Sequence, residues 1–193
     1  MARSLAQTVR GIPSSRSLTL AEQAAIVIIA SIFIALCAHV SLPLPFTPVP
    51  LTLQNFAVLL VGLVLGPRRA FAALVLYLVE GAAGLPVFNP FGPGGVAQLL
   101  GPTGGFLLAY PFVAALAGWI MARGERRFLR AATACIAAEL LLFAGGLSWL
   151  YILTHSLATA IRFGLYWFVF AEVIKIMMAA AIGVRLQRSF LKQ

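Results

Sequence analysis

The sequence predicts an all-α integral membrane protein with six transmembrane helices and both chain ends on the cytoplasmic side. Its 193 residues are 62% hydrophobic and only 10% charged, and the mean hydropathy is +1.00. Soluble domains are nearer half apolar and a quarter charged. Long apolar runs recur along the chain, and basic residues gather between alternate runs. The expected solvent is therefore a lipid bilayer.

One membrane domain is expected at 21–185, between a basic cytoplasmic tail at 1–20 and a second cytoplasmic tail at 186–193. The first apolar run is longer than the core of a signal peptide and lacks a small-residue cleavage pattern, so we expect an uncleaved helix. The six predicted helices lie at about 21–42, 51–65, 70–84, 103–122, 131–153 and 163–184.

The two connections predicted to face outward are rich in proline. Four prolines in eight residues at 43–50 exclude a helix there, because proline lacks the N–H donor and disfavours helix at the preceding residue. The stretch 85–102 combines proline with glycine. It is expected to be irregular apart from a short turn at 96–100.

The remaining connections are predicted to be short. A tight charged turn at 66–69 joins the segments 51–65 and 70–84, and a polar connection is expected at 155–162. A helix of about 15 residues spans only about 22 Å of a hydrocarbon core of about 30 Å. We therefore expect these two segments to insert as a hairpin, with the proline-rich loops completing the span where protein shields them from lipid.

The basic residues predict the orientation. Twelve of the 14 lie in the N-terminal tail, the 66–69 turn, the 123–130 loop and the C-terminal end, which are alternate connections. The others are Arg162, at a helix edge, and Lys175, inside a segment. The positive-inside rule places the basic side in the cytoplasm. The net charge of +9 is thus explained by topology, and nucleic-acid binding is not expected.

Charges at membrane depth are the strongest indication of a site. Glu172 and Lys175 share one helix face, with Phe168 one turn earlier. Each such charge costs about 2.5–3.5 kcal/mol on insertion scales. We favour a site for a ligand with an anionic group and hydrogen-bond donors, since intramembrane charges usually mark sites or pathways. The alternative is an ion pair that only satisfies itself.

Other polar residues are weaker candidates. Glu80 lies near the outer end of its segment, and Glu139 lies deep in another, where it is expected to be neutral or paired across helices. Gln54 and Asn55 begin the second segment, and Asn89 lies in the second outer loop. Amides donate and accept, so they suit a ligand that carries a urea or an amide. Capping or loop hydrogen bonding is the alternative for each.

Small residues on the first segment form a second kind of candidate. Ser31 and Ala35 make a small-xxx-small pair that lets helices approach closely. Cys37 and Cys135 lie in apolar runs and are expected to be packing residues. The sequence contains no nucleotide-binding P-loop, no HExxH and no GxSxG motif. No enzyme activity, metal or cofactor is therefore expected.

Four motifs carry a resemblance to a known family. They are PLPFTPVPLTLQ at 43–54, LGPR at 65–68, GAAGLPVF at 81–88 and LGPTGG at 100–105. The chain resembles the BioY family, the biotin-specific S components of energy-coupling factor (ECF) transporters. The resemblance covers about residues 21–185, nearly the whole chain.

The resemblance implies an S-component fold of six helices and high-affinity biotin binding near the outer face. It also implies a partner transmembrane coupling subunit, ABC-type ATPase subunits, and a multi-pass location in the plasma membrane of a prokaryote. Glu172 stands where the family usually has Asp, with Lys175 kept, and Ser31 stands where the family's first-helix motif usually begins with Ala.

The expected biotin site consists of Lys175, Glu172 and Gln54, with Asn89 and the aromatic residues Phe88 and Phe168. Biotin joins an apolar bicycle to a ureido head and a carboxylate tail. Glu172 and the amides can serve the urea, and Lys175 can serve the carboxylate; which residue meets which end is open.

The first helix, through Ser31 and Ala35, is expected to carry the coupling contact. The alternative is that this strip packs against the protein's own helices. The rival class of function is a stand-alone membrane carrier or channel for a related amphipathic carboxylate.

Overall fold

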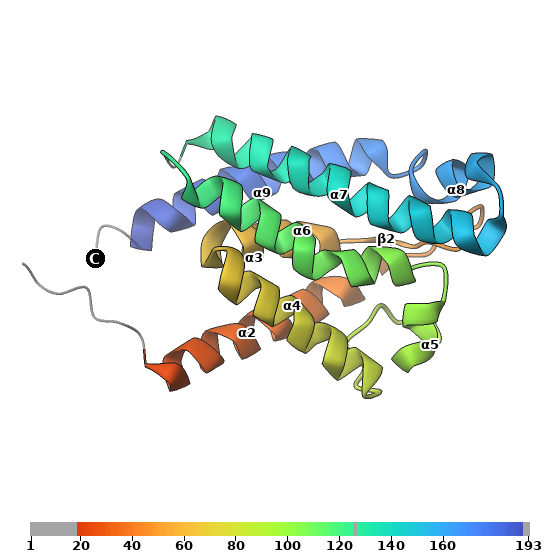
Figure 1. Ribbon diagram of the computed structural model, residues 1–193, viewed down its shortest axis with the longest axis horizontal. Helices are drawn as coiled ribbons and strands as arrows, with labels where there is room; N and C mark the ends of the chain where they lie inside the picture. The colour runs from red at the N-terminus through yellow and green to blue at the C-terminus, as the bar shows by residue number, and fades with distance from the viewer. Residues whose placement is uncertain (1–18, 126, 191–193) are drawn as a thin grey trace, which may run out of the picture.

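The computed structural model describes residues 19–125 and 127–190. Most of the predicted tail 1–20, residue Arg126 and residues 191–193 lie outside the described residues. The described chain is a bundle of helices in which both ends lie at the same end of the molecule (Figure 1). The elements are α2 (Leu20–His39), β1 (Ser41–Leu42), β2 (Leu51–Thr52), α3 (Gln54–Leu65), α4 (Pro67–Ala82), α5 (Gly95–Leu100), α6 (Gly104–Ala122), α7 (Phe128–Thr154), α8 (Leu157–Gly164) and α9 (Val169–Phe190).

Local sequence explains where several helices begin. Thr19 and Glu22 form a capping box at the start of α2, which satisfies backbone donors that have no partner inside the helix. Gly66, at φ 76°, separates α3 from α4, and Pro67 occupies the first turn of α4. Glycine adopts this φ more readily than other residues, and proline is favoured at the start of a helix. The predicted tight turn is thus a single residue between two helices.

Helix α3 lies inside the bundle, where α2, α6 and α9 pack around it. Its residues from Gln54 to Leu63 are all buried. Glycines allow the close approach: a Cβ on Gly62 would lie 2.5 Å from the Ala114 carbonyl oxygen of α6, and a Cβ on Gly118 would lie 2.7 Å from the Gly62 carbonyl oxygen. Such small-residue contacts drive helix association in lipid, where apolar surface alone does not.

The first outer loop is closed at its base by a short strand pair that the sequence did not predict. β1 and β2 pair antiparallel, with Ser41 opposite Thr52 and Leu42 opposite Leu51. The proline-rich residues between them contain no helix, as predicted. The strand pair returns the chain to the bundle at the start of α3.

The prediction of a polar connection at 155–162 is wrong, because most of that range is the helix α8. Ser156 caps this helix by accepting a hydrogen bond from the Thr159 backbone N–H at 3.3 Å. The polar residues lie on a short amphipathic helix rather than in a loop. Helix α9 consequently begins at Val169, not at 163, and its axis is bent by 49° from that of α8. Glu172 therefore lies in the first turn of α9 instead of the middle of a span.

Within the described residues, α2, α6 and α7 are each long and apolar enough to cross a membrane, and α8 with α9 forms a fourth, bent candidate. Helices α3 and α4 have 12 and 16 residues, or about 18 and 24 Å at 1.5 Å per residue. Each of the six predicted segments thus contains a helix, although the sixth is broken between Gly164 and Val169, and the two short ones form the expected hairpin around Gly66.

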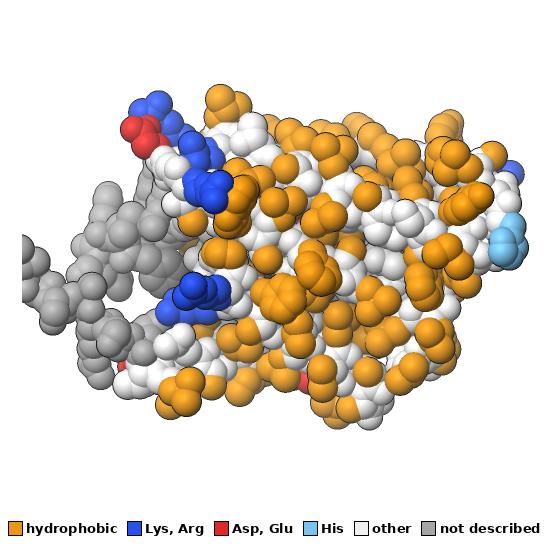
Figure 2. Space-filling model, viewed as in Figure 1, with side chains coloured by type: hydrophobic (Ala, Val, Ile, Leu, Met, Phe, Trp, Pro, Cys, Tyr) orange, Lys and Arg blue, Asp and Glu red, His pale blue; other side chains and the backbone are white. Residues whose placement is uncertain are grey.

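The surface divides into an apolar belt and a basic end. Figure 2 shows hydrophobic side chains over the middle of the molecule, with most Lys and Arg side chains gathered at the end where α2 begins and α9 ends. Among the described residues, most of the basic side chains that predicted the orientation are therefore grouped at one end of the molecule.

Candidate functional site

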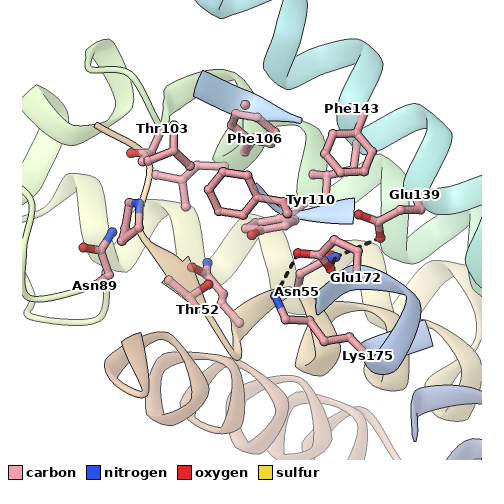
Figure 3. Close-up of a pocket in the computed structure, with 17 residues that line it drawn as sticks. Thr52, Asn55, Asn89, Thr103, Phe106, Tyr110, Glu139, Phe143, Glu172 and Lys175 are labelled. Atoms are coloured by element: carbon pink, nitrogen blue, oxygen red, sulfur yellow. Dashed lines mark hydrogen bonds and ion pairs between the residues drawn. The ribbon is translucent and has the colours of Figure 1, made fainter. Parts of the chain in front are cut away.

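A pocket lies among α3, α6, α7 and α9, beneath the two outer loops (Figure 3). The cavity together with its open mouth has an empty volume of about 540 Å³. The centre of a water molecule can move within about 60 Å³ of it. The enclosed part has room for only a few water molecules, and the rest of this volume is the open mouth of the pocket. Its lining residues are Val49, Pro50, Thr52, Gln54, Asn55, Asn89, Thr103, Phe106, Leu107, Tyr110, Glu139, Leu142, Phe143, Gly164, Phe168, Glu172 and Lys175.

Four buried polar side chains form a network at one side of the pocket, which we call the polar floor: Asn55, Glu139, Glu172 and Lys175. The Asn55 amide nitrogen donates to Glu139 Oε2 at 2.8 Å and to Glu172 Oε2 at 2.7 Å. Lys175 Nζ lies 2.8 Å from Glu172 Oε1. One amide thus bridges two carboxyl groups, and one ammonium group neutralises part of their charge.

The polar floor has acceptors without donors. Asn55 Oδ1 and Glu139 Oε1 are buried and have no hydrogen-bond partner. Leaving such a group unpaired costs about 1–3 kcal/mol, so native proteins rarely do so without a reason. Both residues line the pocket, where a ligand that carries N–H groups would satisfy the two oxygens.

Three different helices bring the polar floor together. Asn55 lies at the start of α3. Glu172 lies in the first turn of α9, where the helix dipole favours its negative charge. Glu139 comes from the interior of α7. The break between α8 and α9 is what allows a helix start at this depth.

A second set of contacts ties the pocket to the second outer loop. Gln54 Nε2 donates to the Tyr77 hydroxyl at 3.0 Å, and that hydroxyl donates to the Val87 carbonyl at 3.1 Å. The Tyr77 ring makes an edge contact with Phe88 at 5.4 Å between centroids. The Gln54 side chain is therefore held at the pocket by a fully buried tyrosine.

The rest of the pocket is mostly apolar. Figure 3 shows the rings of Phe106 and Tyr110 between the polar floor and the side where Asn89 and Thr103 lie, with the Phe143 ring beside Glu139. Phe106 and Tyr110 are buried. The arrangement suits a ligand with an apolar body between two polar ends.

Five of the predicted site residues line this pocket: Lys175, Glu172, Gln54, Asn89 and Phe168. Phe88 is buried but lies behind the pocket, against Tyr77 and Gly81. Sequence reasoning ranked Asn55 and Glu139 low because their partners are remote in sequence, although both are polar residues within apolar runs. It did not name Tyr110, a tyrosine in the middle of the apolar segment 103–122.

The predicted coupling pair does not form one exposed strip. Ser31 is fully buried, and its hydroxyl donates to Glu80 Oε2 of α4. Ala35 is half-buried and packs against the core. No group of three or more His, Cys, Asp or Glu that could hold a metal occurs among the described residues.

The family model of the BioY family matches residues 7–192. The chain belongs to the BioY family. Among its relatives, "Probable biotin transporter BioY" of Pyrococcus horikoshii is 36% identical over 82% of this chain and 94% of its own length. "Biotin transporter BioY" of Thermotoga maritima is 38% identical over the same shares. "Biotin transporter BioY2" of Lactococcus lactis is 39% identical over 77% of this chain and 81% of its own length.

A solved structure supports the fold of this BioY chain. The S-component for biotin from an ECF-type ABC transporter matches with a TM-score of 0.80, covering 89% of this chain and 95% of the other at 24% identity. The predicted all-α S-component fold is therefore confirmed. The relatives carry the names of transporters, in line with a transport component in a membrane.

Proposed function

We propose that this chain is the biotin-binding S component of an ECF-type importer in a prokaryotic plasma membrane. The single observation that carries the proposal is the polar floor, where two unpaired acceptor oxygens lie beside one ammonium group in a buried pocket. Biotin supplies the complement: its ureido ring has two N–H donors and one carbonyl acceptor, and its bicycle and chain are apolar. The family and its transporter relatives point to the same ligand.

The charges of the polar floor favour one orientation of biotin. The floor holds the carboxyl groups of Glu139 and Glu172 and a single ammonium group, that of Lys175. A carboxylate tail placed there would bring a third carboxyl group to one cation, and like charges at such distances disfavour each other. A neutral urea meets no such cost, because its donors face Asn55 and Glu139 and its carbonyl can accept from Lys175.

The carboxylate tail then extends toward the outer loops, past Phe106 and Phe143. Asn89, Thr52 and Thr103 lie on the lining there and can donate to it. In the opposite orientation, Lys175 would hold the carboxylate tail. A ligand that lacks the charge of the tail distinguishes the two orientations. We place Gln54 and Phe168 in the ligand's surroundings, and Phe88 in support of Tyr77.

Energy for uptake is proposed to come from ABC-type ATPase subunits through a coupling subunit, because the chain has no nucleotide motif of its own. Helix α2 remains the proposed contact. Ala35 lies beside the exposed residues Ile32 and Leu36, whereas Ser31 would act indirectly, by packing α2 against α4.

Calorimetric titration of the purified full chain with biotin tests the proposal, and one-to-one saturable binding is the expected result. Biotin methyl ester keeps the ureido group and loses the tail charge, so its affinity should stay within about tenfold of biotin's, or about 1.4 kcal/mol. Absence of biotin binding by folded protein would refute the function. Much weaker binding of the ester alone would refute only the orientation.

Vesicles that contain the chain without other subunits test the competing reading. We expect biotin to bind to the chain without being transported, because the sequence contains no nucleotide-binding motif. Steady biotin uptake by the chain alone would instead support the stand-alone carrier.

A further inference from the structure

A second hollow lies at the basic end of the molecule, where α6 ends and α7 begins. It is an open surface depression with a volume of about 500 Å³, and we call it the cytoplasmic hollow. Its lining residues are Ile120, Glu125, Arg127, Leu129, Arg130 and Thr133. None of them lines the biotin pocket.

Guanidinium groups in and beside the hollow are arranged for an anion. Arg130 donates to the Ile120 carbonyl at 3.3 Å and lies against Gly124, so its fork is held in place with donors to spare. Arg127 is largely exposed, with 75% of its side chain open, and its one ion pair in the described chain is with Glu125, itself 71% exposed. An exposed pair of this kind is worth little and yields readily to a stronger anion.

Exposed apolar surface borders the hollow. Leu129 is 73% exposed on the outer surface of α7. Beside the hollow, Arg123 stacks on the ring of Trp119, 3.4 Å from its centroid. Tryptophan and arginine together are typical of the membrane interface, and phosphate is matched by the arginine fork. The hollow therefore combines guanidinium groups with apolar surface at headgroup depth.

We propose that the cytoplasmic hollow binds the phosphate headgroup of an anionic phospholipid, with Arg127 and Arg130 as its ligands and Leu129 against an acyl chain. A free phosphate ion would make no use of the apolar side. Basic pockets between helices on the cytoplasmic side are the usual form of such sites. The inference does not depend on which molecule occupies the biotin pocket.

The test measures retention of phosphatidylglycerol and phosphatidylcholine by the delipidated full chain, using native mass spectrometry. The double variant Arg127→Gln/Arg130→Gln should bind phosphatidylglycerol about 30-fold more weakly, at about fivefold for each charge near the surface. Phosphatidylcholine retention should not change. The matched control is Arg68→Gln/Arg69→Gln, which removes the same charge at the start of α4. Because neither side chain lines the hollow, this control should weaken phosphatidylglycerol binding clearly less than the double variant does.

The single variant Arg127→Gln, at an exposed position, keeps the test valid if the double variant does not fold, and about a fivefold loss is expected for it. Helix content and thermal unfolding serve as the folding check. Equal losses in the two double variants would overturn the site in favour of general surface charge. Displacement of the lipid by millimolar inorganic phosphate would overturn the lipid assignment. If the double variant retains phosphatidylglycerol but no longer assembles with the coupling subunit, the hollow is a contact for another protein and the lipid proposal is wrong.

Discussion

Replacing Lys175 by methionine tests the polar floor most directly, because methionine keeps the length of the side chain and removes its charge. Lys175 Nζ is 2.8 Å from Glu172 Oε1, and the two side chains are only 10% and 9% exposed. In the proposed orientation the ammonium group donates to the ureido carbonyl, and losing a hydrogen bond of a charged group costs about 1.5–3 kcal/mol. Lys175→Met should therefore weaken biotin binding roughly 10- to 160-fold.

The assay is calorimetric titration with biotin on protein whose helix content and thermal unfolding match those of the unchanged chain. Arg162→Met is the matched control, since Arg162 is exposed and lies outside the pocket lining; its affinity should not change. A dissociation constant for folded Lys175→Met within threefold of the original would refute the role of the ammonium group.

A double variant separates direct ligand contact from the cost of an unpaired carboxylate. Glu172→Gln removes the charge that Lys175→Met leaves behind, while an amide oxygen can still accept from Asn55. The double variant should bind biotin about tenfold more tightly than Lys175→Met alone, or about 1.4 kcal/mol. It should remain weaker than the unchanged chain. Full recovery would mean that Lys175 serves only to neutralise Glu172.

Three further predictions concern packing, the outer loop and coupling. Gly105→Ala should destabilise the chain by about 1–3 kcal/mol, because the new Cβ would lie 2.2 Å from the Trp149 Cβ of α7. Gly101→Ala is the control, since its Cβ would meet nothing closer than 3.4 Å. Thermal unfolding of both variants checks this, and equal stability would contradict it. Phe46→Ala removes a contact between the Phe46 and Trp167 rings, whose centroids are 4.2 Å apart, and such a contact is worth about 0.5–1.5 kcal/mol. Biotin release should then be about 2- to 13-fold faster in stopped-flow measurements. An unchanged release rate would count against a role for this contact. Ala35→Trp should abolish ATP-dependent uptake and leave equilibrium biotin binding nearly intact, and a joint loss would place the residue in internal packing.

Local sequence was sufficient for most of the helices. Long apolar runs between basic or proline-rich connections predict membrane helices wherever they occur, and Gly66 with Pro67 marks a helix boundary by backbone chemistry alone. The failure at 155–162 has a related cause. A short amphipathic helix carries the polar residues of a loop, so composition cannot distinguish the two, whereas the Ser156 cap and the bend before α9 depend on packing.

The site divides in the same way. Glu172 and Lys175 are three residues apart, so helix geometry alone puts them on one face. Asn55 and Glu139 are 84 residues apart, and Asn55 and Glu172 are 117 apart. No local rule brings these side chains together, which explains why sequence reasoning could name no partner for Glu139.

The membrane class, the order of the helices and the family could all be predicted from the sequence, because hydropathy, charge and motifs are properties of consecutive residues. The folded structure was needed to find that Asn55 bridges two carboxyl groups, that two acceptor oxygens of the polar floor remain unpaired, and that the Ser31 hydroxyl contacts Glu80. These depend on how helices cross and how closely their small residues let them approach. Such contacts join residues distant in sequence, and only the packed bundle specifies them.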